Sequence, residues 1–279
     1  ALPTPIVAAL VVTFLVPLLG ACEAFGAGGS AATGGSAATG ASPSPALPLR
    51  VAAAADLRYA MDDLVARWRS AHADAPVEAV YGSSGTFFAQ ISQGAPFDLF
   101  FSADLDYPRR LVEAGLADGS TLRPYAVGQL AVWVPRTSSL DVEGQGLGVV
   151  LDPSVRRIAI ANPEHAPYGR AALAALEAAG YGEVVRPKFV FGDSVAQAAQ
   201  FVESGAADVG IVALALARSP ALAGKGRFAV VPAELYPRLE QAAVVLAGTD
   251  RPSEARAFLD FVLGPEGRAV LDAYGFLAP

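Results

Sequence analysis

Short apolar segments alternate with amphipathic ones along most of this chain, and this alternation constrains the fold more than any other feature. Residues 97–102 have the composition of a strand that is buried on both faces of a sheet. Residues 57–73 have helical periodicity and follow an apolar strand at 49–54. Strands separated by helices of this length predict βαβ units and mainly parallel sheets.

The same pattern continues toward the C-terminus. Further strands are predicted at 77–81, 158–161, 189–191 and 208–213, and further helices at 86–93, 108–114, 169–179 and 195–204. Residues 253–274 read as two helices divided at Gly264-Pro265. Two longer apolar β-type runs, 130–134 and 242–247, have no immediate helix. We expect the chain to cross between two lobes at these runs, which gives lobe 1 at 49–131 plus 241–279 and lobe 2 at 132–240.

Length and charge narrow the class of protein. A chain of 279 residues is long enough for two compact lobes and additional segments. Its formal net charge of -7 argues against nucleic acid as a partner. This charge does not exclude an anionic ligand, because salt screens net charge over about 8 Å and local donors then decide what binds.

The N-terminal segment is typical of an exported lipoprotein. Residues 6–19 form an apolar run that is too short to span a bilayer comfortably, and Leu19-Gly20-Ala21-Cys22 follows it. This pattern resembles a lipobox, in which residues 1–21 are a signal peptide and Cys22 receives the lipid. The alternative is an ordinary signal peptide with an incidental cysteine. Residues 22–48 contain a Gly-Gly-Ser-Ala-Ala-Thr repeat, and this composition predicts a flexible linker.

Four predicted strand-to-helix junctions carry short polar or glycine-containing sequences. These junctions are Ala55-Asp56, Gly82-Ser83-Ser84-Gly85, Pro167-Tyr168-Gly169 and Asp193-Ser194-Val195. Open parallel sheets bind ligands at the carboxyl ends of their strands, where helix N-termini expose unpaired N–H groups. Serine hydroxyls, backbone amides and positive helix ends together predict an oxyanion site that needs no lysine or arginine.

Each of these residues also has a purely structural interpretation. Ser83 and Ser84 could cap a helix, and capping competes with ligand binding for the same hydroxyl. Tyr168 could be a surface aromatic residue at a turn, and Asp56 an ordinary capping residue. Val195 could contribute only its backbone N–H.

Other chemistry has little support in the sequence. A single cysteine excludes an internal disulfide and a multi-cysteine metal site. Asp62 and Asp63 are adjacent, so their carboxylates do not face each other on a helix. His165 has no second histidine nearby, and the common hydrolase, nucleotide-binding and zinc-protease motifs are absent from the sequence. We therefore expect a binding protein with no cofactor and no metal cation, and not an enzyme.

Ordered motifs from residue 49 to residue 279 resemble the molybdate-binding proteins of bacterial ABC importers. The motifs are Ala53-Ala54-Ala55-Asp56-Leu57, Tyr81-Gly82-Ser83-Ser84-Gly85, Gly94-Ala95-Pro96-Phe97-Asp98-Leu99-Phe100, the segment 162–169, Gly210-Ile211-Val212, Gly264-Pro265-Glu266 and Tyr274-Gly275-Phe276. The resemblance implies a two-lobed α/β fold of the type II periplasmic binding proteins. Each lobe would be a mainly parallel sheet flanked by helices, with a dianion held in the cleft by neutral donors.

The resemblance also assigns roles to individual residues. Ser84 falls at a position that offers its hydroxyl and amide, whereas Tyr168 and Val195 fall where the family uses backbone amides. Asp56 falls where the family usually has serine or asparagine. A carboxylate beside a dianion is repelled, so either Asp56 is protonated or it turns away to cap its helix. A second departure is Ala213, where some relatives carry a tyrosine.

The resulting functional hypothesis is a monomeric, lipid-anchored, extracytoplasmic protein that passes molybdate or tungstate to an ABC permease. Its ligand-binding residues would be Asp56, Ser83, Ser84, Tyr168 and Val195. Two alternatives remain open, a binder of another oxyanion such as sulfate and a ligand-sensing lipoprotein with no transporter.

Overall fold

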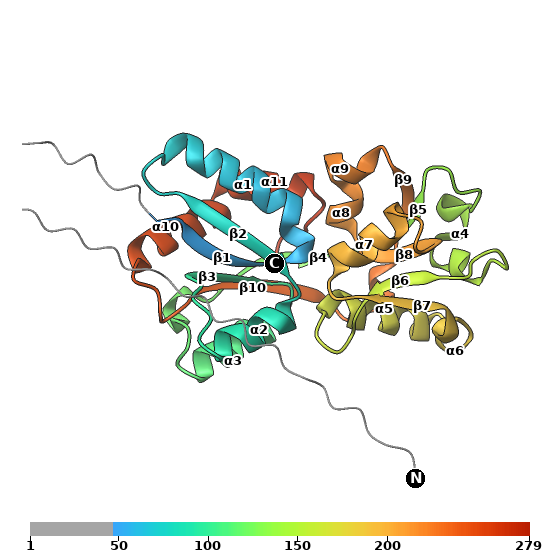
Figure 1. The fold of residues 1–279 in the computed structure, drawn as a ribbon, viewed down its shortest axis with the longest axis horizontal. Coiled ribbons are helices and arrows are strands. Elements are labelled where there is room, and N and C mark those ends of the chain that lie inside the picture. The colour runs from blue at the N-terminus through green and yellow to red at the C-terminus, as the bar shows by residue number, and fades with distance from the viewer. Residues whose placement is uncertain (1–46) are drawn as a thin grey trace, which may run out of the picture. The chain divides into compact units, whose positions relative to one another are not determined.

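The computed structural model describes residues 47–279, which form two lobes with one five-stranded sheet each (Figure 1). The expected signal peptide, Cys22 and nearly all of the expected linker lie outside the described residues. No helix in the part of the chain from 47 onward is long and apolar enough to cross a membrane.

The first sheet has the strand order β2-β1-β3-β10-β4. Its strands are β1 (Leu49–Ala54), β2 (Val77–Gly82), β3 (Leu99–Ser102), β4 (Arg123–Gly128) and β10 (Leu239–Val245). β1 runs parallel to β2 and β3, whereas β10 runs antiparallel to β3 and β4.

The second sheet repeats this arrangement in the order β7-β6-β8-β5-β9. Its strands are β5 (Leu130–Pro135), β6 (Ile158–Ala161), β7 (Phe189–Gly192), β8 (Val209–Ala213) and β9 (Gly226–Val230). β6 is parallel to β7 and β8, and β5 is antiparallel to β8 and β9. The predicted two-lobed α/β class is confirmed, and each sheet is mixed because one strand that has crossed from the other lobe enters it in the opposite direction.

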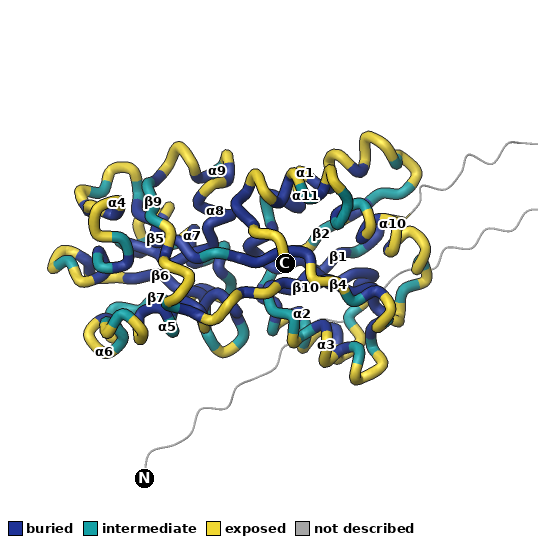
Figure 2. The backbone as a smooth tube through the Cα atoms, turned by 180° about the vertical axis from the view of Figure 1, so that it is seen from behind, coloured by how far each residue is buried: buried dark blue, intermediate teal, exposed yellow. Residues whose placement is uncertain are grey.

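The period of two along the strands of the first lobe decides which helices cover each face. Val51 and Ala53 on β1 pack in one apolar cluster with α1 (Arg58–Ala71), α10 (Pro252–Leu263) and α11 (Pro265–Ala273). Ala52 points the other way and packs with α2 (Ser84–Ser92) and α3 (Asp106–Glu113). Both faces of β1 are thus buried (Figure 2).

In the second lobe, α5 (Pro167–Ala178), α7 (Val195–Glu203) and α8 (Leu214–Arg218) contribute to one apolar cluster around the sheet. A Cβ atom at Gly169 would overlap the carbonyl of Ala161, so α5 can lie this close to β6 only with glycine there. The remaining helices are short. They are α4 (Val142–Gln145), α6 (Gly182–Val185), α9 (Pro220–Ala223) and 3-10 turns at Ala55–Leu57, Gly119–Thr121, Gly146–Leu151, Arg186–Lys188 and Ala233–Leu235.

The chain crosses between the sheets at Gln129 and again between β9 and β10. The lobe boundaries expected after residues 131 and 240 fall inside β5 and β10, which belong whole to the second and first sheets. β4 and β9 were not predicted. Both are edge strands with a polar start, and Pro124 in β4 is tolerated because an edge strand needs fewer ladder hydrogen bonds.

Candidate functional site

The five residues predicted to bind a ligand line one small cavity between the lobes. The first lobe contributes Asp56, Ser83 and Ser84, and the second contributes Tyr168 and Val195. The cavity wall is completed by Ala54, Ala55, Gly82, Ala103, Ala166 and Pro167. No lysine or arginine is among these lining residues.

The two serines at the start of α2 have different roles. Ser83 is the N-cap: its hydroxyl accepts from the Thr86 N–H at 3.5 Å and donates to the His165 carbonyl of the second lobe at 2.7 Å. Ser84 is the first helical residue, and its Oγ accepts from the Ala103 N–H at 2.9 Å. The Ser84 hydroxyl can still donate its own hydrogen into the cavity. Capping therefore belongs to Ser83, and Ser84 is the better candidate for a ligand contact.

The second lobe presents two further helix N-termini. Tyr168 is the second residue of α5, after Pro167, and Val195 is the first residue of α7. The first N–H groups of a helix have no intrahelical acceptor, so the amides of Tyr168 and Val195 are available at the cavity. Ser194 caps α7 by accepting from the Gln197 N–H at 3.3 Å. The positive ends of α2, α5 and α7 thus meet at one place.

Asp56 does not cap its helix. It is 1 % exposed, and its Oδ2 accepts hydrogen bonds from the Tyr168 hydroxyl at 2.9 Å and from Gln241 Nε2 at 2.6 Å. Its Oδ1 is buried and has no hydrogen-bond partner among residues 47–279. Burial raises the pKa of Asp56 from 3.8 to about 6, although the hydrogen bonds from Gln241 and Tyr168 and the nearby backbone N–H groups of Asp56 and Leu57 act in the opposite direction.

Two residues that the sequence reasoning missed complete this network. Gln241 on β10 also donates to the Tyr168 hydroxyl at 3.2 Å, and Tyr125 on β4 donates to Gln241 Oε1 at 2.6 Å. A Cβ atom at Gly128 would overlap the Tyr168 hydroxyl, so the glycine at this crossing leaves room for the network. A lone amide beside the apolar run 242–247 was the only sequence signal for Gln241.

Further polar contacts hold the lobes together around the cavity. The Gly85 N–H donates to the His165 carbonyl at 3.0 Å, beside the Ser83 bond to the same carbonyl. A Cβ atom at Gly85 would lie 2.5 Å from this carbonyl oxygen, so the approach of the lobes requires glycine there. Arg170 on α5 also forms an ion pair with Asp104 in the first lobe.

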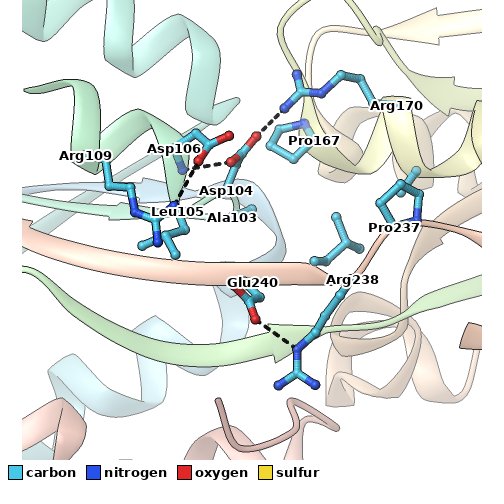
Figure 3. A pocket seen from close by; sticks show the side chains of 12 residues that line it. Ala103, Asp104, Leu105, Asp106, Arg109, Pro167, Arg170, Pro237, Arg238 and Glu240 are labelled. Atoms are coloured by element: carbon cyan, nitrogen blue, oxygen red, sulfur yellow. Dashed lines mark hydrogen bonds and ion pairs between the residues drawn. The ribbon is translucent and has the colours of Figure 1, made fainter.

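A second and larger cleft lies next to the cavity and shares Ala103 and Pro167 with it. Figure 3 shows its charged lining. Three ion pairs occupy this lining, Arg170–Asp104, Arg109–Asp106 and Arg238–Glu240. Because each arginine already has a carboxylate partner, this cleft is the weaker candidate for an anion despite its size. The described residues contain no group of three or more His, Cys, Asp or Glu side chains that could hold a metal ion.

The comparison with protein families decides the class. The family model described as "Bacterial extracellular solute-binding protein" matches residues 49–277. The chain belongs to this family. Two similar family members are molybdate-binding proteins ModA. The one from Rhodobacter capsulatus is 38% identical over 72% of this chain and 77% of its own length. The one from Azotobacter vinelandii is 35% identical over 83% of this chain and 90% of its own length.

Solved structures of solute-binding proteins have the same fold. The Azotobacter vinelandii periplasmic molybdate-binding protein matches with a TM-score of 0.77 and 33% identity, over 83% of this chain and 99% of that one. The sulfate-binding protein SubI from Mycobacterium tuberculosis matches with a TM-score of 0.65 at 18% identity, which shows the fold alone. The expected resemblance is confirmed, and the chain is a solute-binding protein rather than an enzyme.

Proposed function

We propose that this solute-binding protein captures molybdate, or tungstate, in the interlobe cavity and delivers it to an ABC permease. The observation that carries the proposal is the convergence of Ser84, Tyr168 and Val195, from both lobes, on a cavity without cationic side chains. Fixed neutral donors at helix N-termini suit an oxyanion, because they stabilise negative charge without forming an ion pair. The names of two relatives at 35% and 38% identity support molybdate as the anion.

Closure of the lobes is the step that couples binding to delivery. A ligand favours the closed form only through contacts that need both lobes at once. An anion between Ser84 of the first lobe and Val195 of the second makes such contacts. The closed form then presents a surface to the permease that the open form lacks.

We also propose that Cys22 carries the lipid that anchors the protein outside the cytoplasm, with residues 22–48 as the flexible tether. Support comes from the apolar run that precedes the cysteine and from the Gly-Ser-Ala-Thr composition that follows it. Expression of the chain with Cys22→Ser in a bacterial host is expected to move it from the membrane fraction to the soluble fraction. An unchanged distribution would remove the anchor from the proposal.

A thermal-shift and calorimetry series with molybdate, tungstate, sulfate and phosphate tests the ligand. A ligand at 100 times its dissociation constant stabilises the folded form by about 2.7 kcal/mol, which is a clear shift in melting temperature. Molybdate and tungstate are expected to give this shift. A shift with sulfate or phosphate alone would identify that anion, rather than molybdate, as the ligand. No shift with any of the four anions would contradict the proposed function.

A further inference from the structure

The proposed anion cavity contains a carboxyl group with one oxygen free of protein hydrogen bonds. Asp56 lines the cavity, is 1 % exposed, and directs Oδ2 to Tyr168 and Gln241. The other oxygen, Oδ1, is buried and has no partner in the part of the chain that the structure describes. A buried polar atom without a partner is costly, so a ligand that pairs with Oδ1 gains a contact the protein has left open.

The surroundings of Asp56 contain no compensating cation. The titratable groups that face it are the hydroxyls of Tyr168 on α5 and Tyr125 on β4, and burial raises the pKa of both tyrosines well above the usual value. Tyr236 lies near Tyr168, and its hydroxyl accepts a hydrogen bond from the Leu130 N–H at 3.1 Å.

The helices that pack on the turn around Asp56 bring no cationic side chain into the cavity either. α7 presents Val195 to the cavity, and α8 begins with buried apolar residues while its Arg218 lies beside Gly275. Arg58 does not line the cavity; it lines a neighbouring hollow that shares Ala55, Gly82 and Ser83 with the cavity, and its guanidinium lies over the Tyr81 ring. An ionised Asp56 and a dianion would therefore repel each other across the cavity with nothing between them.

We propose that the cavity binds its oxyanion together with one proton, which resides on Asp56 Oδ1 and is donated in a hydrogen bond to a ligand oxygen. This inference rests on the proposed function. The proton comes from the solvent when the ligand is a fully ionised dianion such as molybdate, and no bond within the anion is made or broken. The two hydrogen bonds to Oδ2 leave Oδ1 as the oxygen that carries the proton.

The ordinary chemistry of the carboxyl group supports this assignment. Because burial already raises the pKa of Asp56 to about 6, protonation near neutral pH costs little. A neighbouring dianion raises the pKa further, since it disfavours the charged form. Neutral Asp56 then offers one donor to the ligand, as the serine or asparagine expected at this position would.

Proton uptake during molybdate binding tests the inference directly. Calorimetric titrations at about pH 7.5, in buffers with different ionisation enthalpies, are expected to show uptake of about one proton per anion. The affinity is expected to fall by about tenfold for each pH unit between about pH 6.5 and the pKa of the complex. Asp56→Asn keeps an uncharged donor at this place, so it should bind without proton uptake and with a nearly flat pH profile. Asp74→Asn removes an exposed carboxylate far from the cavity lining and should behave as the wild type.

The possible results separate this inference from the proposed function. Molybdate binding by the wild type with no proton uptake and no pH dependence would overturn the shared proton and leave the oxyanion function in place. Absence of binding to every oxyanion tested would overturn both. If Asp56→Asn does not fold, the buffer series on the wild type still gives the proton count alone.

Discussion

The Tyr168 hydroxyl donates a hydrogen bond of 2.9 Å to Asp56 Oδ2, and this bond joins the second lobe to the first inside the cavity. Gln241 holds the same carboxylate oxygen from β10, so one buried network spans both lobes. Protein groups therefore make part of the contact between the lobes at the cavity. A buried network rigidifies a site when every member has its partner, and Asp56 Oδ1 is the atom of this network that still lacks one among residues 47–279.

Ser84→Ala is expected to weaken molybdate binding by about 1–3 kcal/mol, because a hydrogen bond to a charged ligand is lost. The measurement is a calorimetric titration at constant pH. Ser92→Ala is the matched control, since Ser92 ends the same helix and its exposed hydroxyl only donates to the Phe88 carbonyl. Equal affinities for the two variants would assign Ser84 a structural role through its bond to the Ala103 N–H.

Gly85→Ala is expected to keep the lobes apart. The added methyl group would lie 2.5 Å from the His165 carbonyl oxygen and 2.8 Å from the Tyr107 hydroxyl. Small-angle scattering should show a larger radius of gyration than the wild type in the presence of molybdate, and binding should be weaker. Gly224→Ala is the control, because nothing lies within 4 Å of its added Cβ. A Gly85→Ala protein that closes like the wild type would remove this contact from the closure mechanism.

Asp56→Asn is expected to change how the stability of the ligand-free protein depends on pH. The folded pKa of about 6 lies above the unfolded value of 3.8, so the folded chain binds more protons between these values. The free energy of unfolding contributed by Asp56 therefore falls as the pH rises from about 4 to 6. Asp56→Asn has no carboxyl group to titrate, so its free energy of unfolding does not fall in this way. Denaturant titration should find the variant more stable than the wild type by up to about 3 kcal/mol at pH 7.5. Equal stability at both ends of the range would contradict the raised pKa.

Removal of the Arg170–Asp104 ion pair is expected to have only a small effect on closure. The two side chains are 41% and 27% exposed, and ion pairs of this kind contribute about 0.2–1 kcal/mol. Arg170→Gln, Asp104→Asn and the double variant should therefore each change the affinity for molybdate less than Ser84→Ala does. The double-mutant cycle formed by these variants gives the coupling energy of the pair. A larger coupling energy would make this surface pair, rather than the buried network, the principal link between the lobes.

Much of the architecture follows from local patterns. The apolar strands and the helical periodicity predicted the helices that border the site, and Gly94, Gly115 and Gly180, which follow three of the predicted helices, have positive φ angles in the structure. The serines at the starts of α2 and α7 are sequence signals for helix N-termini, and the structure brings both ends to the cavity. These features depend on neighbours in sequence, which is why a single sequence reveals them.

The network behind the cavity depends on contacts between distant segments. Tyr125, Tyr168 and Gln241 come from two lobes, and Gln241 lies 185 positions after the Asp56 that it binds. Nothing in the local pattern distinguishes a buried amide on β10 from an ordinary polar residue at a strand end. Gly128 is a similar case, because glycine is required there by the position of the Tyr168 hydroxyl, which a Cβ atom would overlap. Only the folded arrangement reveals these roles.

The central claim is that neutral donors from both lobes hold an oxyanion between Ser84 and Val195. A crystal structure of the protein grown with molybdate, with the metal located by its anomalous scattering, tests this claim most directly. We expect one molybdenum peak in the cavity, with the molybdate oxygens hydrogen-bonded to the Ser84 hydroxyl, the Tyr168 and Val195 amides and the Asp56 carboxyl. A peak in the cleft lined by Arg109, Arg170 and Arg238, or no peak in a crystal soaked to saturation, would contradict it.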